Sequence, residues 1–450
     1  MFSITNPFDS TFLSEHQYIT DFDAEEKLKI SKKTFDTWGF TTIAERLKFI
    51  KNLVFALTKK QHFLAKQCTL EMGKPISQAI AEVEKCQILC EYYIKHAEKF
   101  LESRQISTDG TQSYVVYEPL GVILGVMPWN FPYWQVFRFA IPAIIAGNTI
   151  VVKHASNVAG SAQLIEDLFT EAGFPDGVYT NLLISGDQVK AIIENPVVEA
   201  VSLTGSEKAG ASVASIAANQ IKKAVLELGG SNGLIVLEDA DLDSVIPIAV
   251  NARFQNAGQS CIAAKRFFVH KNIFDNFIEK FTKAVSVLKT GDPMNEDTYL
   301  GPLARTDLAE DVGKQVNKSI EMGAKVILGG KRDGAFYTPT ILTDVTTEMP
   351  VFNEEVFGPA VPVMSFETFE EAVALSNKSN FGLGVSIFTS DVEGIKTKVN
   401  LFQEGAVFIN AMVKSDPALP FGGVKRSGYG RELSEEGIKE FVKVKTVYIG

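Results

Sequence analysis

The sequence contains few cysteines, and this scarcity limits the kinds of site that it can hold. Four cysteines are scattered through 450 residues. They are too few and too far apart for a disulfide framework, so we expect a reducing compartment. Cys86 and Cys90 would share one face of a helix, and because no histidine or acidic ligand pattern lies nearby, we interpret them as core residues. We therefore expect no metal site.

An excess of positive charge and a long uninterrupted apolar segment are also missing. The net charge of −10 and the pI near 5.3 argue against nucleic acid as a partner. The most apolar stretch, residues 122–152, is interrupted by prolines and carries Arg138, so we expect no membrane span. The first residues lack the basic and apolar segments of a signal peptide. We expect a soluble, cytoplasmic protein of two or three domains, at about 150 residues per domain.

The apolar periodicity changes along the chain. Residues 21–100 are typical of helices, with Thr41 as an N-cap, a stop at Gly73 and Pro75, and Ser77 opening the next helix. Strand-like segments then alternate with helical ones: strands at 122–126, 149–153, 180–184 and 200–204, with helices after Pro132, at 161–172 and after Ser206. This alternation predicts a parallel sheet flanked by helices, as in a Rossmann-like domain. A second alternating set, residues 233–423 with helices at 241–256 and 274–288, predicts a second α/β domain.

Two other segments have the alternating pattern of strands. Asp109-Gly110 is a hairpin signal ahead of an alternating segment at 113–117. The last residues, 441–448, alternate like a half-buried edge strand, which needs pairing or protection.

Cys261 is the candidate nucleophile. It follows the sequence Phe-Gln-Asn-Ala-Gly-Gln-Ser, in which Gly258 allows a close backbone approach to a ligand. The Cys261 N–H would lie beside the sulfur, where an oxyanion would form. A buried structural cysteine is the alternative. The favourable context is Glu227 before two glycines, Asn130 between two prolines, and the downstream segment 353–359. A thiol, a carboxylate and an amide donor are the groups needed for acyl chemistry at an aldehyde carbon.

In this order and at these separations, the four motifs resemble the aldehyde dehydrogenase superfamily, from Asn6-Pro7 to the last strand. The resemblance implies an α/β fold with a dinucleotide-binding domain (1–102 and 120–229), a catalytic domain (230–436), and a small β oligomerisation arm with a tail strand (103–119 and 437–450). It also implies a homodimer or homotetramer. An intramolecular sheet remains the alternative for the arm.

The cofactor site combines a weak local signal with this resemblance. The segment from Thr204 to Gly210 ends a strand and opens a helix whose N–H groups could hold a pyrophosphate, although an ordinary turn has the same pattern. The resemblance implies that the cofactor-binding residues are Trp129, Lys153, Ser156, Gly205, Ser206, Glu355 and Phe357. Ser156 stands where NAD-preferring relatives often carry a glutamate, so a carboxylate that would repel a 2′-phosphate is missing. We expect NADP as the preferred cofactor, with NAD as a second acceptor.

The resemblance also assigns the catalytic roles. The Cys261 thiolate attacks the aldehyde, and Asn130 together with the Cys261 N–H stabilises the oxyanion. After hydride transfer, Glu227 activates water to release the acid from the thioester. Relatives that pass the acyl group to coenzyme A often lack this glutamate, so its presence favours hydrolysis.

Arg138 is the strongest indication of the substrate. Trp134 and Arg138 are four residues apart in an apolar helix, where a guanidinium needs an anionic partner. A salt bridge to a protein carboxylate would satisfy it. This segment and the one around Ser415 resemble the succinate-semialdehyde dehydrogenases, in which the arginine and serine bind the distal carboxylate and the tryptophan forms a pocket wall. Three alternatives remain: a broader or glutarate-semialdehyde enzyme, an esterase using Cys261 and Glu227 without redox chemistry, and a non-catalytic relative.

Overall fold

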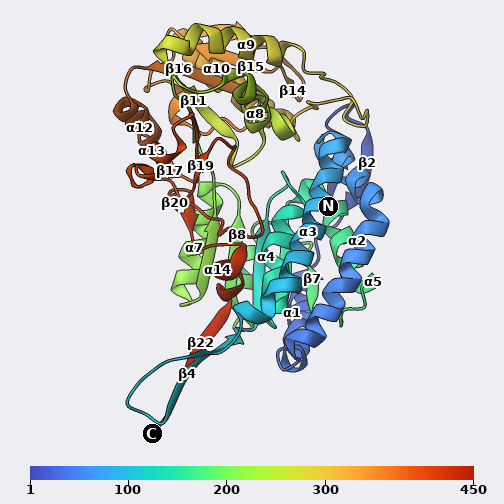
Figure 1. The fold of residues 1–450 in the computed structure, drawn as a ribbon. Coiled ribbons are helices and arrows are strands. Elements are labelled where there is room, and N and C mark those ends of the chain that lie inside the picture. Colours follow the sequence, from blue (N-terminus) through green and yellow to red (C-terminus); the bar gives the residue numbers. More distant parts are fainter.

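The computed structural model describes residues 1–450 and contains two large sheets and a smaller three-stranded sheet. The two large sheets lie in the lower and upper parts of Figure 1, and the small sheet projects from the lower part and ends beside the C-terminus. The α/β class and the two alternating units expected from the sequence are therefore confirmed.

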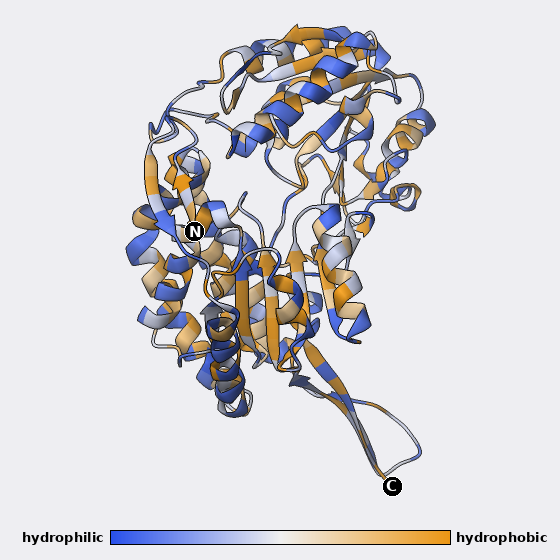
Figure 2. Ribbon diagram, turned by 180° about the vertical axis from the view of Figure 1, so that it is seen from behind, coloured by the Kyte–Doolittle hydropathy of each residue, from blue (hydrophilic) through white to orange (hydrophobic).

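The first large sheet has the strand order β21-β9-β8-β5-β6-β7. Its strands are β5 (Val122–Met127), β6 (Thr149–His154), β7 (Tyr179–Asn181), β8 (Val198–Thr204), β9 (Lys223–Glu227) and β21 (Gly428–Tyr429). All neighbours are parallel except β21 and β9. The helices of this part are α1 (Asp21–Trp38), α2 (Ile43–Met72), α3 (Ile76–Phe100), α4 (Trp134–Ile145), α5 (Ala159–Glu171), α6 (Val189–Glu194) and α7 (Glu207–Asn219). The central strand β5 is apolar throughout because helices cover both faces of the sheet, as the hydropathy colours of Figure 2 show.

The second large sheet has the order β12-β15-β16-β11-β10-β18-β19 and is parallel except for the β12–β15 pair. Its strands are β10 (Asn232–Val236), β11 (Ala264–His270), β12 (Lys325–Leu328), β15 (Thr340–Thr343), β16 (Ala360–Phe366), β18 (Val385–Phe388) and β19 (Val407–Ile409). The helices of this part are α8 (Leu242–Phe254), α9 (Phe274–Ser286), α10 (Thr306–Glu321), α11 (Pro350–Asn353), α12 (Phe369–Asn377) and α13 (Val392–Lys396), followed by α14 (Ser434–Lys439) near the C-terminus.

Several short elements complete the fold. Two-stranded ladders join β1 (Phe2–Thr5) to β2 (Phe12–His16), β13 (Arg332–Asp333) to β14 (Phe336–Tyr337), and β17 (Phe381–Gly382) to β20 (Val424–Lys425). Four 3₁₀ turns are η1 (Ser156–Val158), η2 (Gln255–Gly258), η3 (Lys271–Ile273) and η4 (Val399–Leu401).

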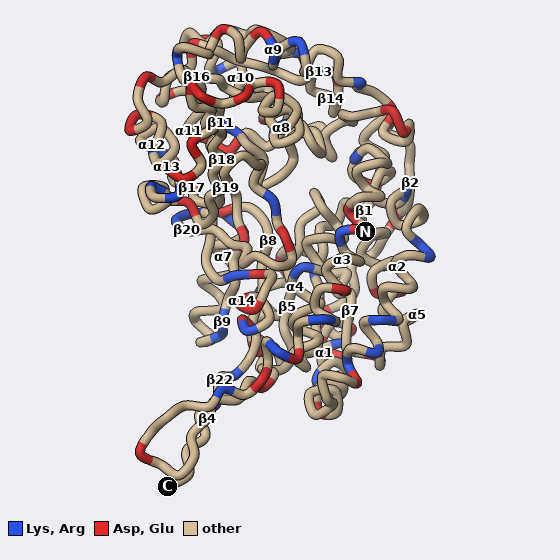
Figure 3. Tube along the Cα trace, in the orientation of Figure 1, with Lys and Arg blue, Asp and Glu red and all other residues tan.

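The small sheet consists of β22 (Val442–Ile449), β4 (Gln112–Pro119) and β3 (Arg104–Gln105), all antiparallel. The tail strand therefore pairs inside the chain with β4, and its outer edge is free. It was expected to be half-buried, but only Val442 is buried, because no other layer packs against this ribbon. Charges of both signs are interspersed over both large parts of the chain (Figure 3). No helix is both long enough and apolar enough to cross a bilayer.

Three predicted boundaries are wrong by a few residues. The cap of α2 is Thr42, not Thr41, because Thr42 and Glu45 form a reciprocal capping box. The helix α3 begins at Ile76, directly after Pro75, rather than at Ser77. The strand expected at 180–184 ends at Asn181 as β7, whose ladder to β6 extends only from Tyr179 to Asn181.

Candidate active site

The predicted site residues of the first part gather at one edge of its parallel sheet. Asn130 follows β5, Lys153 is near the end of β6, Gly205 follows β8, and Glu227 ends β9. These strands are neighbours and parallel, so their carboxyl ends meet along the same edge. This edge is where open α/β sheets bind ligands.

A cavity of about 440 Å³ lies at this edge. Eight of the predicted site residues line it: Trp129, Asn130, Gly205, Ser206, Glu227, Cys261, Glu355 and Phe357. The Trp129 and Phe357 rings meet edge to face, with their centroids 5.8 Å apart. The structure therefore brings together residues from both large parts of the chain.

A second cavity, of about 280 Å³, contains the predicted substrate residues. Trp134, Arg138 and Ser415 line it, and so do Lys85 and Cys261. Cys261 is thus shared by the two cavities, with one side toward the predicted cofactor residues and the other toward the predicted substrate residues. This position allows one sulfur to meet ligands from both sides.

The loop before Cys261 is shaped by three consecutive left-handed residues, Asn256, Ala257 and Gly258. A Cβ on Gly258 would lie 2.4 Å from the Gly358 carbonyl oxygen. The glycine is therefore required for close packing against the segment that carries Glu355, and its predicted role in a close approach to a ligand stays a prediction.

The Asn130 amide is fixed against this loop. Its Nδ2 donates to the Gln259 carbonyl at 3.1 Å, and the Asn130 carbonyl accepts from Asn256 Nδ2 at 2.8 Å. The side-chain amide has two protons, so one N–H remains for a ligand in the cavity. Asn130 Oδ1 is buried without a hydrogen-bond partner. The amide is thus a pre-positioned donor close to the thiol loop.

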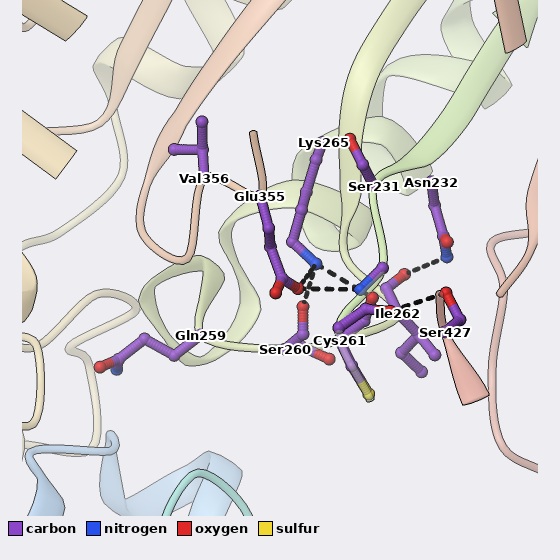
Figure 4. A network of polar contacts seen from close by, with 12 residues as sticks. Ser231, Asn232, Gln259, Ser260, Cys261, Ile262, Lys265, Glu355, Val356 and Ser427 are labelled. Atoms are coloured by element: carbon purple, nitrogen blue, oxygen red, sulfur yellow. Dashed lines mark hydrogen bonds and ion pairs between the residues drawn. The ribbon is translucent and has the colours of Figure 1, made fainter. Parts of the chain in front are cut away.

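Lys265 holds the other side of the loop. Its Nζ donates to the Ser260 carbonyl at 2.7 Å and to the Cys261 carbonyl at 3.0 Å, and it pairs with Glu355 at 2.9 Å. Glu355 also accepts from the Gly230 N–H at 3.0 Å. Figure 4 shows this network, with the Cys261 sulfur pointing away from it. Sequence reasoning missed Lys265, although a charged pair at the start of the buried strand β11 was a usable signal.

The pKa values of the two reactive groups, the Cys261 thiol and the Glu227 carboxyl, are both raised. Burial raises the pKa of the Cys261 thiol, while the positive charges of Arg138 and Lys265 oppose that rise. Burial also raises the pKa of Glu227 well above its usual value, and the neighbouring Glu432 carboxylate adds to the effect. Glu227 Oε1 has no hydrogen-bond partner in the protein. A carboxyl group with a raised pKa can both release a proton and take one up, as proton exchange with water requires.

Arg138 pairs with a protein carboxylate, as the alternative from the sequence anticipated. Its Nε contacts Glu432, and the two side chains are only 1% and 3% exposed. The guanidinium also lies 4.4 Å from the centre of the Phe421 ring. Arg138 Nη2 remains buried without a hydrogen bond. Nothing local in the sequence distinguishes Glu432 as the partner, because the two residues meet only through the fold.

The remaining cofactor candidates lie beside the first cavity rather than on its wall. Lys153 and Ser156 are at the carboxyl end of β6, and Ser156 Oγ is 2.9 Å from the Tyr18 hydroxyl. His154 is buried against the Pro132 carbonyl, and burial lowers its pKa to about 4, so it is a neutral packing group.

The donor set fits a dinucleotide. Ser206 caps α7 by accepting from the Ala209 N–H at 3.3 Å. The N–H groups of Glu207 and Lys208 in the first turn have no carbonyl partner within the helix, and such groups commonly bind anions. Thr204 Oγ1 is buried without a partner and lines the same cavity. A Cβ on Gly229 would lie 2.3 Å from Glu355 Oε2, so a side chain there would displace that carboxylate.

Comparison with known proteins gives concordant matches. The profile described as "Aldehyde dehydrogenase family" matches residues 1–447. A probable succinate-semialdehyde dehydrogenase from Synechocystis sp., named with NADP(+), is 48% identical over 98% of this chain and 96% of its own. The succinate semialdehyde dehydrogenase Sad of Escherichia coli K12, named with NAD(P)+, is 43% identical over 98% and 96%. The crystal structure of succinic semialdehyde dehydrogenase from Streptococcus pyogenes in complex with NADP+ has a TM-score of 0.97, at 39% identity, and each chain covers 100% of the other.

Proposed function

The chain belongs to the aldehyde dehydrogenase family, and on this premise we propose that it oxidises succinate semialdehyde to succinate with NADP, or less readily NAD, as the acceptor. The observation that carries the proposal is the position of Cys261 between a cofactor-type cavity and a second cavity lined by cationic side chains. The names of the relatives and the neighbour solved with NADP+ support the same substrate and cofactor.

The reaction begins at Cys261. The thiolate adds to the aldehyde carbon, forming a C–S bond and placing negative charge on the former carbonyl oxygen. The free N–H of the Asn130 amide and the Cys261 backbone N–H stabilise this charge, and one such donor is typically worth about 3–4 kcal/mol. The bound cofactor supplies the chemistry of accepting the hydride. A thioester then remains on Cys261.

Glu227 completes the reaction. Burial and the neighbouring Glu432 raise the pKa of Glu227, which favours its protonated form, and the residue acts as a base in its ionised form. The ionised carboxylate takes a proton from water, the hydroxide adds to the thioester, and the C–S bond breaks to return the thiolate. The products are the carboxylic acid and the regenerated enzyme.

Trp134, Arg138 and Ser415 form the distal end of the substrate pocket in this proposal. The charge of Arg138 is balanced by Glu432, but its buried Nη2 has an unused proton that can be donated to a substrate carboxylate. Ser415 lies against Trp134, whose Nε1 donates to the serine hydroxyl at 3.1 Å. Arg138 therefore contributes a hydrogen bond to substrate binding rather than a net positive charge.

Lys153 and Ser156 support the preference for NADP. Both are at the end of β6, next to the edge that holds the cofactor-type cavity. The Ser156 hydroxyl offers a hydrogen bond where a carboxylate would repel a 2′-phosphate.

The free edge of the small sheet formed by β3, β4 and β22 supports an oligomer. The outer edge of β22 is free, and three of its apolar side chains, Val444, Tyr448 and Ile449, are 65%, 55% and 44% exposed. We propose that this arm, residues 103–119 and 437–450, joins copies into a dimer or tetramer, and that the two large sheets belong to a cofactor domain and a catalytic domain. The four free cysteines support a reducing, cytoplasmic location.

The test is a panel of aldehydes with the purified enzyme. Succinate semialdehyde, glutarate semialdehyde and butanal are each supplied with NADP or NAD, and Cys261→Ala serves as the control. We expect the highest kcat/KM with succinate semialdehyde and NADP. Ester hydrolysis without aldehyde-dependent cofactor reduction would indicate an esterase, and the absence of both activities would indicate a non-catalytic relative.

A further inference from the structure

The second cavity has one charged wall residue that the proposed function has not used. Lys85, on α3, lines the cavity together with Cys261, Arg138 and Ser415. It is half-buried, and its Nζ lies 4.1 Å from the centre of the Trp134 ring. Lys85 is therefore held with its ammonium group among the residues proposed for substrate binding.

Lys85 differs from the other charged residues of the cavity wall because it has no ion-pair partner. Glu82 pairs with the buried Lys74, Arg138 pairs with Glu432, and Lys414 pairs with Asp416 at 3.2 Å. No carboxylate lies within ion-pair distance of Lys85. The cavity wall thus has one uncompensated positive charge, which matches the single negative charge of a monocarboxylate.

The hydrogen bonds of Ser415 indicate where an anion would bind. Its hydroxyl oxygen accepts from Lys85 Nζ at 2.7 Å and from Trp134 Nε1 at 3.1 Å. Both lone pairs are therefore occupied, and the single hydroxyl proton has no acceptor in the protein. Lys85 has two further N–H donors without partners. The group as a whole presents donors and no free acceptor, as a carboxylate requires.

We propose that Lys85 is a specificity-determining residue, whose ammonium group receives the distal carboxylate of the aldehyde beside the Ser415 hydroxyl. The inference rests on the proposed function and extends it, because it assigns the net charge that selects anionic aldehydes to Lys85 rather than to Arg138. Arg138 then donates a hydrogen bond while its charge is neutralised by Glu432.

The surroundings of Lys85 give this recognition a pH dependence. Burial, with a smaller contribution from the charge of Arg138 on α4, lowers the pKa of Lys85 to about 8, although Cys86 and Glu82 on α3 and Asp416 in the facing loop act in the opposite direction. Lys414 also faces the cavity, but it is paired with Asp416. Below that pKa the ammonium is charged and binds a carboxylate, and above it the preference for anionic aldehydes declines.

The first experiment compares Lys85→Met with wild type on succinate semialdehyde and butanal. We expect kcat/KM for succinate semialdehyde to fall by about 10- to 100-fold, mainly through KM, because the contact is remote from the reacting carbon. The butanal value is expected to fall by no more than about threefold. Lys85→Arg retains the charge and is expected to restore most of the loss. Lys95→Met, on the exposed side of α3, is the matched control.

The second experiment needs no variant. The ratio of kcat/KM for succinate semialdehyde to that for butanal is followed from pH 6 to 10, so that the ionisation of Cys261, common to both substrates, cancels. A decline of the ratio above about pH 8, which Lys85→Arg removes, supports the assignment. Equal losses for both aldehydes in Lys85→Met, or a flat ratio in wild type, would overturn it. A wild-type enzyme that does not prefer succinate semialdehyde at any pH would instead overturn the proposed function, and the role of Lys85 with it.

Discussion

The buried pair between Arg138 and Glu432 can be tested by a double-mutant cycle. The variants are Arg138→Met and Glu432→Gln, which keep the side-chain volume approximately constant, and the double variant. Each single change leaves a buried group without its partner, since the side chains are 1% and 3% exposed. Breaking such a pair from one side typically costs about 3–5 kcal/mol.

The loss should appear in melting curves. Phe421 places its ring against the guanidinium, and its backbone exchanges two hydrogen bonds of 2.7 Å with Glu432, so neither side chain can move easily to water. At about 2–4 °C per kcal/mol for a cooperative unit of 150–250 residues, each single variant is expected to melt about 6–20 °C below wild type. The double variant should lose much less than the sum of the two, because no uncompensated charge remains.

Activity separates the structural role of Arg138 from its proposed contact with substrate. A hydrogen bond to a charged group is worth about 1.5–3 kcal/mol, so Arg138→Met should lower kcat/KM for succinate semialdehyde about 10- to 150-fold more than for butanal. Glu432→Gln should retain the preference for the anionic aldehyde. Equal losses on both aldehydes in Arg138→Met would reduce Arg138 to a structural role, and unchanged melting in Glu432→Gln would refute the reasoning on the pair.

Three further outcomes are expected. Cys261→Ala should abolish turnover, whereas Glu227→Gln should keep a burst of NADPH in rapid mixing but show slow steady-state turnover. Because the pKa of Glu227 is raised, wild-type turnover that is limited by deacylation should increase with pH, and Glu227→Gln should lose that increase. A Glu227→Gln enzyme without a burst would mean that Glu227 acts earlier, in deprotonating Cys261. Ser156→Glu should weaken the use of NADP by about 1–3 kcal/mol and spare NAD in steady-state kinetics, and equal losses would place Ser156 away from the 2′-phosphate. Mild oxidation should give sulfenic acid or an adduct at Cys261, since the other three cysteines are buried in the core, and a disulfide found by mass spectrometry would contradict this.

Much of the site could be predicted because its residues stand at the ends of strands. The positions of Asn130 and Glu227 follow from the apolar strands before them, and parallel neighbours align those ends without further information. Cys261 was recognisable as the candidate nucleophile from its own motif and from the presence of Asn130 and Glu227 elsewhere in the chain. The close contact of Gly258 with Gly358 could not be predicted, because no local pattern connects the two residues.

The sequence by itself determined the two alternating α/β units, the terminal edge strand and the thiol, carboxylate and amide set, because periodicity and strand ends are local properties of the chain. Only the tertiary structure decided which charges are compensated. Glu432 meets Arg138, Lys265 meets Glu355, and Lys85 meets Ser415 across 330 residues. A buried charge is stabilised by its partner in space, and the partner is known only after the fold has brought distant segments together.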